Sequence, residues 1–201
     1  MNTIIFATSN QGKMREVREL LSDLPFVVKS MKEAGITVDI VENGTTFAEN
    51  AMIKARTVAA AQKDGAAIVL ADDSGLEVDY LDKAPGVYSA RFMGEDTSYD
   101  IKNNYIIGKL EGVPDEKRTA RFVCAIAAVF PDGTERTAHG AIEGIIGYKQ
   151  AGENGFGYDP IFFLPEYGCT TAELPAEEKN KISHRGRALT EMKKIISEYM
   201  K

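Results

Sequence analysis

A long apolar stretch, a turn and an alternating stretch together decide the fold class of this sequence. Residues 120–130 read ARFVCAIAAVF, residues 131–133 read PDG, and residues 135–143 read ERTAHGAIE. β-Branched and aromatic residues favour strands, and the combination of Pro, Asp and Gly marks a turn. The three segments therefore predict a β-hairpin.

The chain before this hairpin alternates between strand and helix patterns. Residues 3–7 form a short apolar run, and residues 14–24 then place apolar side chains at helical spacing. Thr46 and Glu49 have the spacing of a capping box, which predicts a second helix that begins near Thr46 and stops at Gly65.

Further elements complete the pattern on both sides of the hairpin. Residues 68–71 predict a buried strand, and residues 161–163 predict another. A third helix is expected from the spacing of Ile101, Tyr105, Ile106 and Leu110. Ser183 is a candidate N-cap for a last helix over residues 188–199. Helical units around a hairpin predict an α/β protein with a mixed sheet and two lobes around a cleft.

Size and charge limit the classes of protein and partner. The chain has 201 residues, 44% hydrophobic and 27% charged, which suits one globular domain over 1–201. The net charge is −6 and there is no polybasic run, so we expect no nucleic acid polymer as partner. The longest apolar stretch, 122–130, is far shorter than the roughly 20 residues of a membrane helix.

The two cysteines and the start of the chain predict a cytoplasmic protein. Cys124 and Cys169 are 45 positions apart and have no metal-ligand spacing, which is typical of a reducing compartment. The first residues lack the basic and apolar segments of a secretory signal.

The segment from Thr8 to Lys13, TSNQGK, lies between the first predicted strand and helix. A lysine in the first turn of a helix is unfavourable unless an anion sits there, and a phosphate would be such an anion. The segment lacks the first Gly of a Walker A loop and the Ser or Thr that follows its Lys. An ordinary loop with a solvent-facing lysine is the alternative.

The segment from Asp72 to Gly75, DDSG, follows the buried strand over 68–71. Successive strand side chains point in opposite directions, so one carboxylate is expected to face a cleft while the other holds the turn. Together with Glu42, the carboxylates would suit Mg²⁺, which prefers oxygen ligands. A simple capping turn is the alternative.

Two further segments suit a nucleotide. In residues 154–160, NGFGYDP, glycines on both sides of Phe156 permit close approach of a ligand, and an exposed phenyl ring can stack on a base. Lys179, His184 and Arg185 place basic groups at or before a predicted helix. The alternatives are a tight turn with core aromatics and a solvated charged turn.

Six segments together resemble the inosine/xanthosine triphosphate pyrophosphatase family in order and spacing, over nearly the whole chain. They are residues 8–13, 42–51, 71–76, 85–91, 155–160 and 183–185. The resemblance implies an elongated α/β fold with a nucleotide-binding cleft, a homodimer, and Mg²⁺-dependent hydrolysis of non-standard purine nucleoside triphosphates to the monophosphate and pyrophosphate. Such an enzyme removes deaminated purines from the nucleotide pool.

The resemblance also implies roles for individual residues. Asp73 would accept a proton and bind the metal, Glu42 would assist with the metal, and Lys13 would act on the phosphates. The residues implied to bind substrate are Thr8, Ser9, Asn10, Gln11, Gly12, Lys13, Ser74, Phe156, Gly157, Tyr158, Asp159, Lys179, His184 and Arg185. Asn50 and Lys54, one helical turn apart, are expected near the phosphates on the spacing alone.

Two other functions stay open on the sequence. One is a related pyrophosphatase that acts on pyrimidine or modified nucleotides, and the other is a sensor that binds a nucleotide without hydrolysis. The presence of Lys13, Asp73 and the complete 155–160 loop argues against the sensor. A Nudix hydrolase is disfavoured because the chain has no Gly-x₅-Glu-x₇-Arg-Glu run.

Overall fold

A computed structural model describes residues 3–201 of the chain. Its strands are β1 (Thr3–Phe6), β2 (Val27–Ser30), β3 (Ile68–Val78), β4 (Thr119–Val129), β5 (Glu135–Ile146), β6 (Phe162–Leu164) and β7 (Cys169–Thr170). Its helices are α1 (Gln11–Leu20), α2 (Phe47–Ala60), α3 (Tyr99–Lys109), α4 (Ala176–Ile182) and α5 (His184–Tyr199). Short 3₁₀ helices span Asp79–Leu81, Gly86–Tyr88, Asp115–Lys117 and Asp159–Ile161.

The strands form one mixed sheet in the order β2-β1-β3-β4-β5-β6-β7. β1 runs parallel to β2 and to β3, with Ile4 beside Val28 and Ile68. β6 is antiparallel to β5 and β7. The mixed α/β class expected from the hairpin is therefore confirmed.

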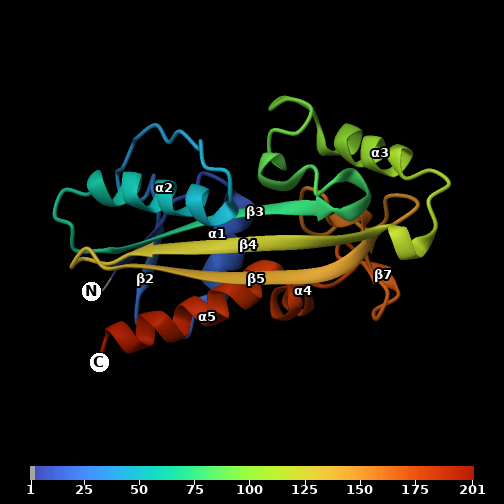
Figure 1. Cartoon of the computed structure of the whole chain (residues 1–201). Helices are drawn as coiled ribbons and strands as arrows, with labels where there is room; N and C mark the ends of the chain where they lie inside the picture. The colour runs from blue at the N-terminus through green and yellow to red at the C-terminus, as the bar shows by residue number, and fades with distance from the viewer. Residues whose placement is uncertain (1–2) are drawn as a thin grey trace. The chain divides into compact units, whose positions relative to one another are not determined.

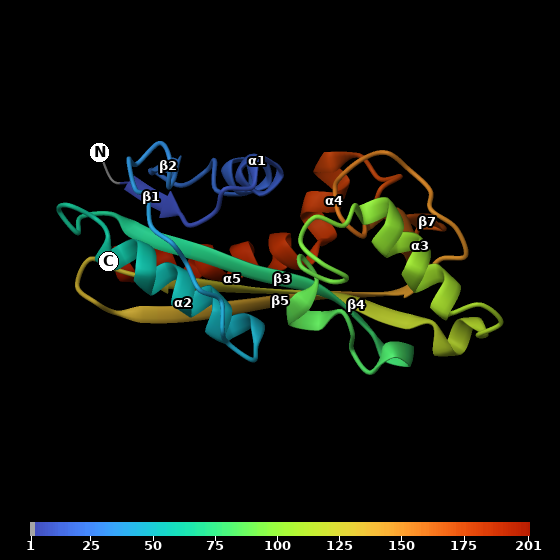
Figure 2. The same cartoon turned by 90° about the horizontal axis from the view of Figure 1, so that it is seen from above.

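The chain divides into two compact units, each with its own apolar core. Unit 1 consists of residues 1–73, 124–140 and 185–201, and unit 2 consists of 74–123 and 141–184. In unit 1, side chains of α1, β1, β3, β4 and α5 form the core, with Phe6, Leu70 and Met192 among those fully buried. In unit 2, Leu76 and Phe162 are among the buried side chains that form the core. Within unit 1, α2 and α5 lie on opposite faces of the strands (Figures 1 and 2).

Most of the elements expected from the sequence are present, with some boundaries moved. The hairpin closes where the Phe130 amide donates to the Thr134 carbonyl at 2.9 Å, and Gly133 adopts a φ of +82° there. The capping box of α2 is present with Thr46 as N-cap. The predicted stop at Gly65 is wrong, because α2 already ends at Ala60.

The inward face of α3 differs from the expected apolar stripe. Ile101 and Tyr105 are 53% and 40% exposed, whereas Lys102, Asn103 and Ile106 are buried. The prediction is right about the helix and wrong about these two side chains. The spacing of apolar residues predicted the helix. It did not predict which polar side chains are buried, because these are held by hydrogen bonds to other segments.

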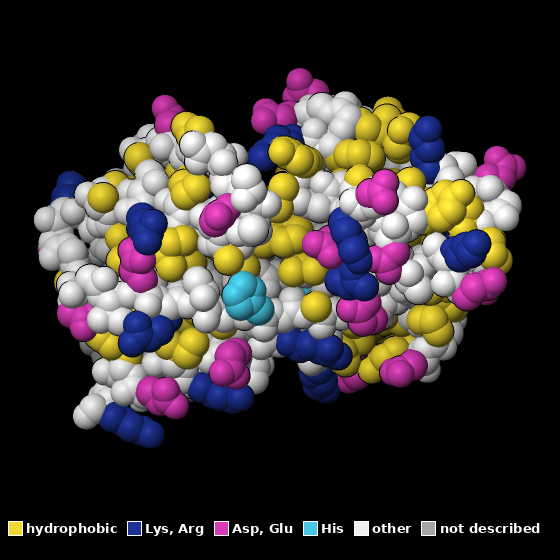
Figure 3. Space-filling model, in the orientation of Figure 1, with side chains coloured by type: hydrophobic (Ala, Val, Ile, Leu, Met, Phe, Trp, Pro, Cys, Tyr) yellow, Lys and Arg dark blue, Asp and Glu magenta, His cyan; other side chains and the backbone are white. Residues whose placement is uncertain are grey.

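Charged side chains of both signs are interspersed on the molecular face in Figure 3. Lys and Arg lie among Asp and Glu there, and no continuous basic surface forms on that face.

Candidate active site

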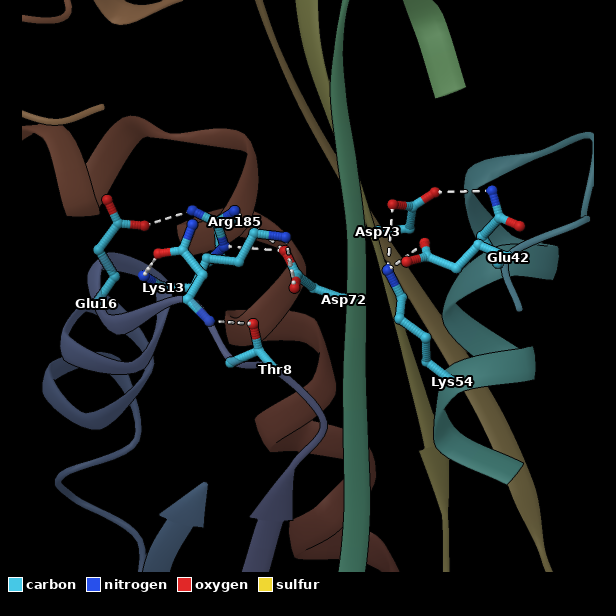
Figure 4. Close-up of polar contacts among 10 residues, drawn as sticks. Thr8, Lys13, Glu16, Glu42, Lys54, Asp72, Asp73 and Arg185 are labelled. Atoms are coloured by element: carbon cyan, nitrogen blue, oxygen red, sulfur yellow. Dashed lines mark hydrogen bonds and ion pairs between the residues drawn. The ribbon is translucent and has the colours of Figure 1, made fainter. Parts of the chain in front are cut away.

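β3 directs Asp72 and Asp73 to opposite sides of the sheet. Figure 4 shows the strand running between two groups of polar side chains, one around each carboxylate. The opposite orientation was expected from strand alternation and is confirmed. The expectation that one carboxylate holds a turn is wrong, because β3 continues to Val78 and both residues lie inside the strand.

Asp72 is held between two cations from helices that are distant in sequence. Lys13 Nζ lies 3.0 Å from Asp72 Oδ1, and Arg185 Nη2 lies 3.0 Å from Asp72 Oδ2. Arg185 also pairs with Glu16. Asp72 is 1% exposed and Arg185 2%. Burial alone would raise the pKa of Asp72, but Lys13 and Arg185 outweigh it and hold the pKa far below its usual range.

The start of α1 places Lys13 beside Asp72. Asn10 is the N-cap, and its Oδ1 accepts the Lys13 amide at 3.1 Å. Thr8 Oγ1 accepts the Asn10 amide at 3.1 Å, which orders the preceding loop. The anion beside Lys13 in this structure is the Asp72 carboxylate, so the conflict between a lysine and a helix N-terminus is relieved within the chain.

Asp73 faces a second group on the other side of β3. Lys54 Nζ lies 2.7 Å from Glu42 Oε2 and 3.3 Å from Asp73 Oδ1. Asn50 Nδ2 donates to Asp73 Oδ2 at 3.2 Å. Burial raises the pKa of the Asp73 carboxyl above its ordinary value, although the charge of Lys54 opposes the rise. A carboxylate with a raised pKa is better suited than Asp72 to accept a proton.

The capping box explains why Asn50 and Lys54 reach Asp73. Thr46 fixes the first residue of α2, and Asn50 and Lys54 follow it on one helix face, where both are buried. The Gly44 amide donates to Asn50 Oδ1 at 2.8 Å, so the amide nitrogen of Asn50 is oriented toward the carboxylate. The spacing led us to expect Asn50 and Lys54 near the phosphates, and the structure places both side chains beside Asp73.

Glu42 and Asp73 fit a divalent cation. Their oxygens converge on one position, which the Lys54 ammonium occupies. Proteins usually hold Mg²⁺ with one or two carboxylates, and water and substrate phosphates complete the shell. Within residues 3–201 no group of three or more His, Cys, Asp or Glu side chains is placed to hold a metal. Glu42 and Asp73 supply the number of carboxylates that such an ion takes from a protein when water and phosphates supply the rest.

Asp159 organises the second candidate region, which lies in unit 2. Its carboxylate accepts the Phe156 amide at 2.8 Å and the Thr171 hydroxyl at 2.9 Å. Lys179 Nζ lies 2.7 Å from Asp159 Oδ2 and 5.1 Å from the centre of the Phe156 ring. A Cβ on Gly155 would lie 2.2 Å from Asp159 Oδ2, so only glycine fits at this position.

The other expected site residues of unit 2 differ in exposure. Tyr158 is buried and donates its hydroxyl to the Ser89 carbonyl at 2.7 Å, so this ring belongs to the core as the alternative interpretation had it. Phe156 is partly exposed. The His184 ring stacks on Phe122 with centroids 4.9 Å apart, and Ser74 lies within β3.

The structure thus brings the expected residues together in two sets. Unit 1 contains Lys13 with Arg185 around Asp72, and Glu42 with Asp73 around Lys54. Unit 2 contains residues 156–159 with Lys179. The sequence analysis missed the contribution of Glu16, which pairs with Arg185 across 169 positions. A carboxylate one helical turn from Lys13 is too common a pattern to single it out.

Comparison with known proteins decides the family. A family model described as the Ham1 family matches residues 4–195. The chain belongs to the Ham1 family. A relative from Desulforamulus reducens, called a dITP/XTP pyrophosphatase, is 50% identical over 194 residues, which cover 96% of this chain and 95% of the relative. A relative of the same name from Listeria monocytogenes serotype 4b is 48% identical over 199 residues, covering 98% and 96%.

Solved structures of Ham1 proteins share the fold. The Ham1 protein of Coxiella burnetii is 40% identical, covers 98% of this chain and 100% of its own, and has a TM-score of 0.86. The Ham1 protein of Staphylococcus aureus is 37% identical, with the same coverage and TM-score. These matches confirm the family resemblance and the α/β class that the sequence predicts.

Proposed function

We propose that this chain is a nucleoside triphosphate pyrophosphatase that hydrolyses ITP, dITP and XTP to the monophosphate and pyrophosphate. The observation that carries the proposal is the identity of about half of its residues, over nearly the full length, to relatives named dITP/XTP pyrophosphatase. The enzyme removes deaminated purines from the nucleotide pool, and residues 1–201 act as one domain.

The triphosphate and Mg²⁺ bind at the residues around β3. Residues 8–13 cradle the phosphates, with Lys13 acting on their charge, and Glu42 and Asp73 hold the metal. The convergence of both carboxylates on the Lys54 ammonium supports this assignment, because two negative oxygens there already face one positive charge. Mg²⁺ neutralises phosphate charge when it is bound.

Asp73 is the general base. It takes a proton from water as the water oxygen attacks the α-phosphorus. The bond from that phosphorus to the oxygen bridging the α- and β-phosphates then breaks, and pyrophosphate leaves. The raised pKa of Asp73 and its orientation by Asn50 support this role. Asp72 is a poor candidate, since two cations keep its pKa low.

The nucleoside is bound by Ser74, Phe156, Gly157, Tyr158, Asp159, Lys179, His184 and Arg185. The partly exposed Phe156 ring beside the Lys179 ammonium supports stacking on a base. Donors from Lys179 or Arg185 directed at a 6-oxo group would reject adenine, because its 6-amino group is itself a donor.

The remaining proposals concern assembly and location. The family resemblance supports a homodimer. Cys124 and Cys169 are not joined in a disulfide, which supports a cytoplasmic location. The interspersed charges in Figure 3 support a small substrate over a nucleic acid polymer. In the described part of the chain no helix combines the length and apolarity needed to cross a membrane.

A substrate panel tests the function. Pyrophosphate release is measured with inosine, deoxyinosine, xanthosine, guanosine, adenosine and uridine triphosphates, first with Mg²⁺ and then with a chelator. Metal-dependent release that strongly favours inosine and xanthosine is expected. Preference for uridine or another standard nucleotide would overturn the substrate assignment, and tight binding without release would favour a sensor.

A further inference from the structure

A buried amide on α3 reaches the loop that carries Phe156. We propose that Asn103 and Gln150 form a bridge, the Asn103–Gln150 bridge, that positions Gly157 and with it the Phe156 ring for base recognition. Both are positioning residues that do not touch the substrate. The inference rests on the proposed function in one respect, that this loop holds the base.

The bridge is a continuous chain of side-chain amides. Asn103 Nδ2 donates to the Gly157 carbonyl at 3.2 Å and to Gln150 Oε1 at 3.1 Å. Gln150 Nε2 donates in turn to Asp100 Oδ1 at 2.7 Å and to Asn104 Oδ1 at 3.1 Å. All five residues lie in unit 2. The first two turns of α3 are thereby connected to the backbone of the loop.

Asn103 lowers the stability of the fold relative to an apolar side chain at this position. It is 1% exposed, and its Oδ1 has no hydrogen-bond partner among residues 3–201. An unpaired buried acceptor costs free energy that an apolar side chain would avoid. Exchanging the positions of the amide oxygen and nitrogen would not satisfy the oxygen. It would then face two other acceptors, Gln150 Oε1 and the Gly157 carbonyl. The two bonds of Nδ2 are therefore what the side chain contributes.

Two hydrogen bonds hold the backbone at Phe156 and at the residue that follows it. Gly155 and Gly157 have φ values of +76° and +70°, which glycine adopts more readily than other residues. On one side, the Phe156 amide is held by Asp159. On the other, the Gly157 carbonyl is held by Asn103. The second contact comes from α3, outside the 155–160 segment.

The test uses two variants that break the bridge and one matched control. Asn103→Leu removes both hydrogen bonds that Nδ2 donates. Gln150→Ala removes one of their acceptors. Because Gln150 is partly exposed, this second variant is expected to fold even if Asn103→Leu does not. Ile101→Ala is the control, because it shortens an exposed side chain of the same helix and leaves every hydrogen bond of Asn103 and Gln150 in place. Amide hydrogen exchange over residues 154–160 is measured without nucleotide, and kcat and KM are measured with inosine triphosphate.

Faster exchange over residues 154–160 is expected in both bridge variants and not in Ile101→Ala. KM should rise about fivefold, the effect of about one neutral hydrogen bond, with kcat within about twofold of the parent. Unchanged exchange in a folded Gln150→Ala, or a fall in kcat equal to the rise in KM, would overturn the proposal. If the parent protein hydrolyses none of the triphosphates in the panel, the proposed function is overturned. Faster exchange in the bridge variants would then still support the positioning of the loop.

Discussion

Replacement of Asp73 by Asn is expected to abolish most pyrophosphate release while leaving the fold intact. Asn has the same size but cannot take a proton from water, and it is a weaker ligand for a divalent cation. Loss of a general base typically lowers the rate by about 10²- to 10⁴-fold. Since Asp73 is also a proposed metal ligand, we expect the fall in kcat to lie at the upper end of that range.

The effect on stability follows from the contacts of the carboxylate. Asp73 accepts from Lys54 and from Asn50, and the single oxygen of an Asn can replace only one of these bonds. The lost bond costs about 1 kcal/mol. Against this, the pKa of Asp73 is raised above 3.8, so its charge destabilises the fold as pH rises through the folded pKa. A neutral Asn removes that cost at pH 7, and the two effects oppose each other.

The assay pairs pyrophosphate release with thermal unfolding in the presence of a chelator. Asp132→Asn is the matched control, because Asp132 is an exposed turn residue whose acceptor for the Thr134 amide is retained by Asn. Both variants should unfold within about 1 kcal/mol of the parent, and only Asp73→Asn should lose turnover. Turnover of Asp73→Asn within twofold of the parent would refute the assignment of the base.

Three other perturbations test the loop, a turn and a helix cap. Gly155→Ala should lower kcat/KM far more than Gly168→Ala, because both glycines have positive φ but only at Gly155 would a Cβ strike Asp159; equal losses would contradict this steric reason. Glu33→Gln should flatten the rise of Tm between pH 2 and 4.5. Hydrogen bonds from the Ser30 amide and from Arg18 lower the pKa of Glu33 from 4.5 to about 2, so its stabilisation is present above 4.5 and lost as pH falls toward 2. Thr46→Ala should lower the free energy of unfolding by about 1 kcal/mol in denaturant titrations, since it removes the N-cap of α2, and a loss below about 0.3 kcal/mol would contradict the capping box.

Features that depend on neighbouring residues could be predicted from the sequence. The capping box at Thr46 and Glu49, the turn at Gly133 and the opposite orientation of Asp72 and Asp73 each follow from local backbone rules. The spacing of Asn50 and Lys54 likewise placed two buried partners of Asp73 on one helix face. These predictions required no knowledge of which segments meet.

Features that depend on distant segments could not be predicted. Asp72 meets Lys13 across 59 positions and Arg185 across 113, and no local pattern selects those cations from the other lysines and arginines of the chain. The same limit applies to α3. Its buried Asn103 carries no hydrophobic signal, and its partners Gln150 and Gly157 lie about fifty positions away. The sequence analysis therefore could not supply the distant partners of buried polar side chains.

Asp72 and Asp73 show why residue type alone does not assign a catalytic role. The two carboxylates are adjacent, and both are buried, yet their pKa values shift in opposite directions. Strand alternation sends Asp72 toward two cations, where it stays ionised and holds Lys13 and Arg185 in place. It sends Asp73 toward one shared ammonium and a second carboxylate, Glu42, where burial prevails and the proton affinity rises. The different surroundings of the two carboxylates therefore predict different effects of substitution. Asp72→Asn should loosen Lys13 and Arg185, and Asp73→Asn should remove the proposed base.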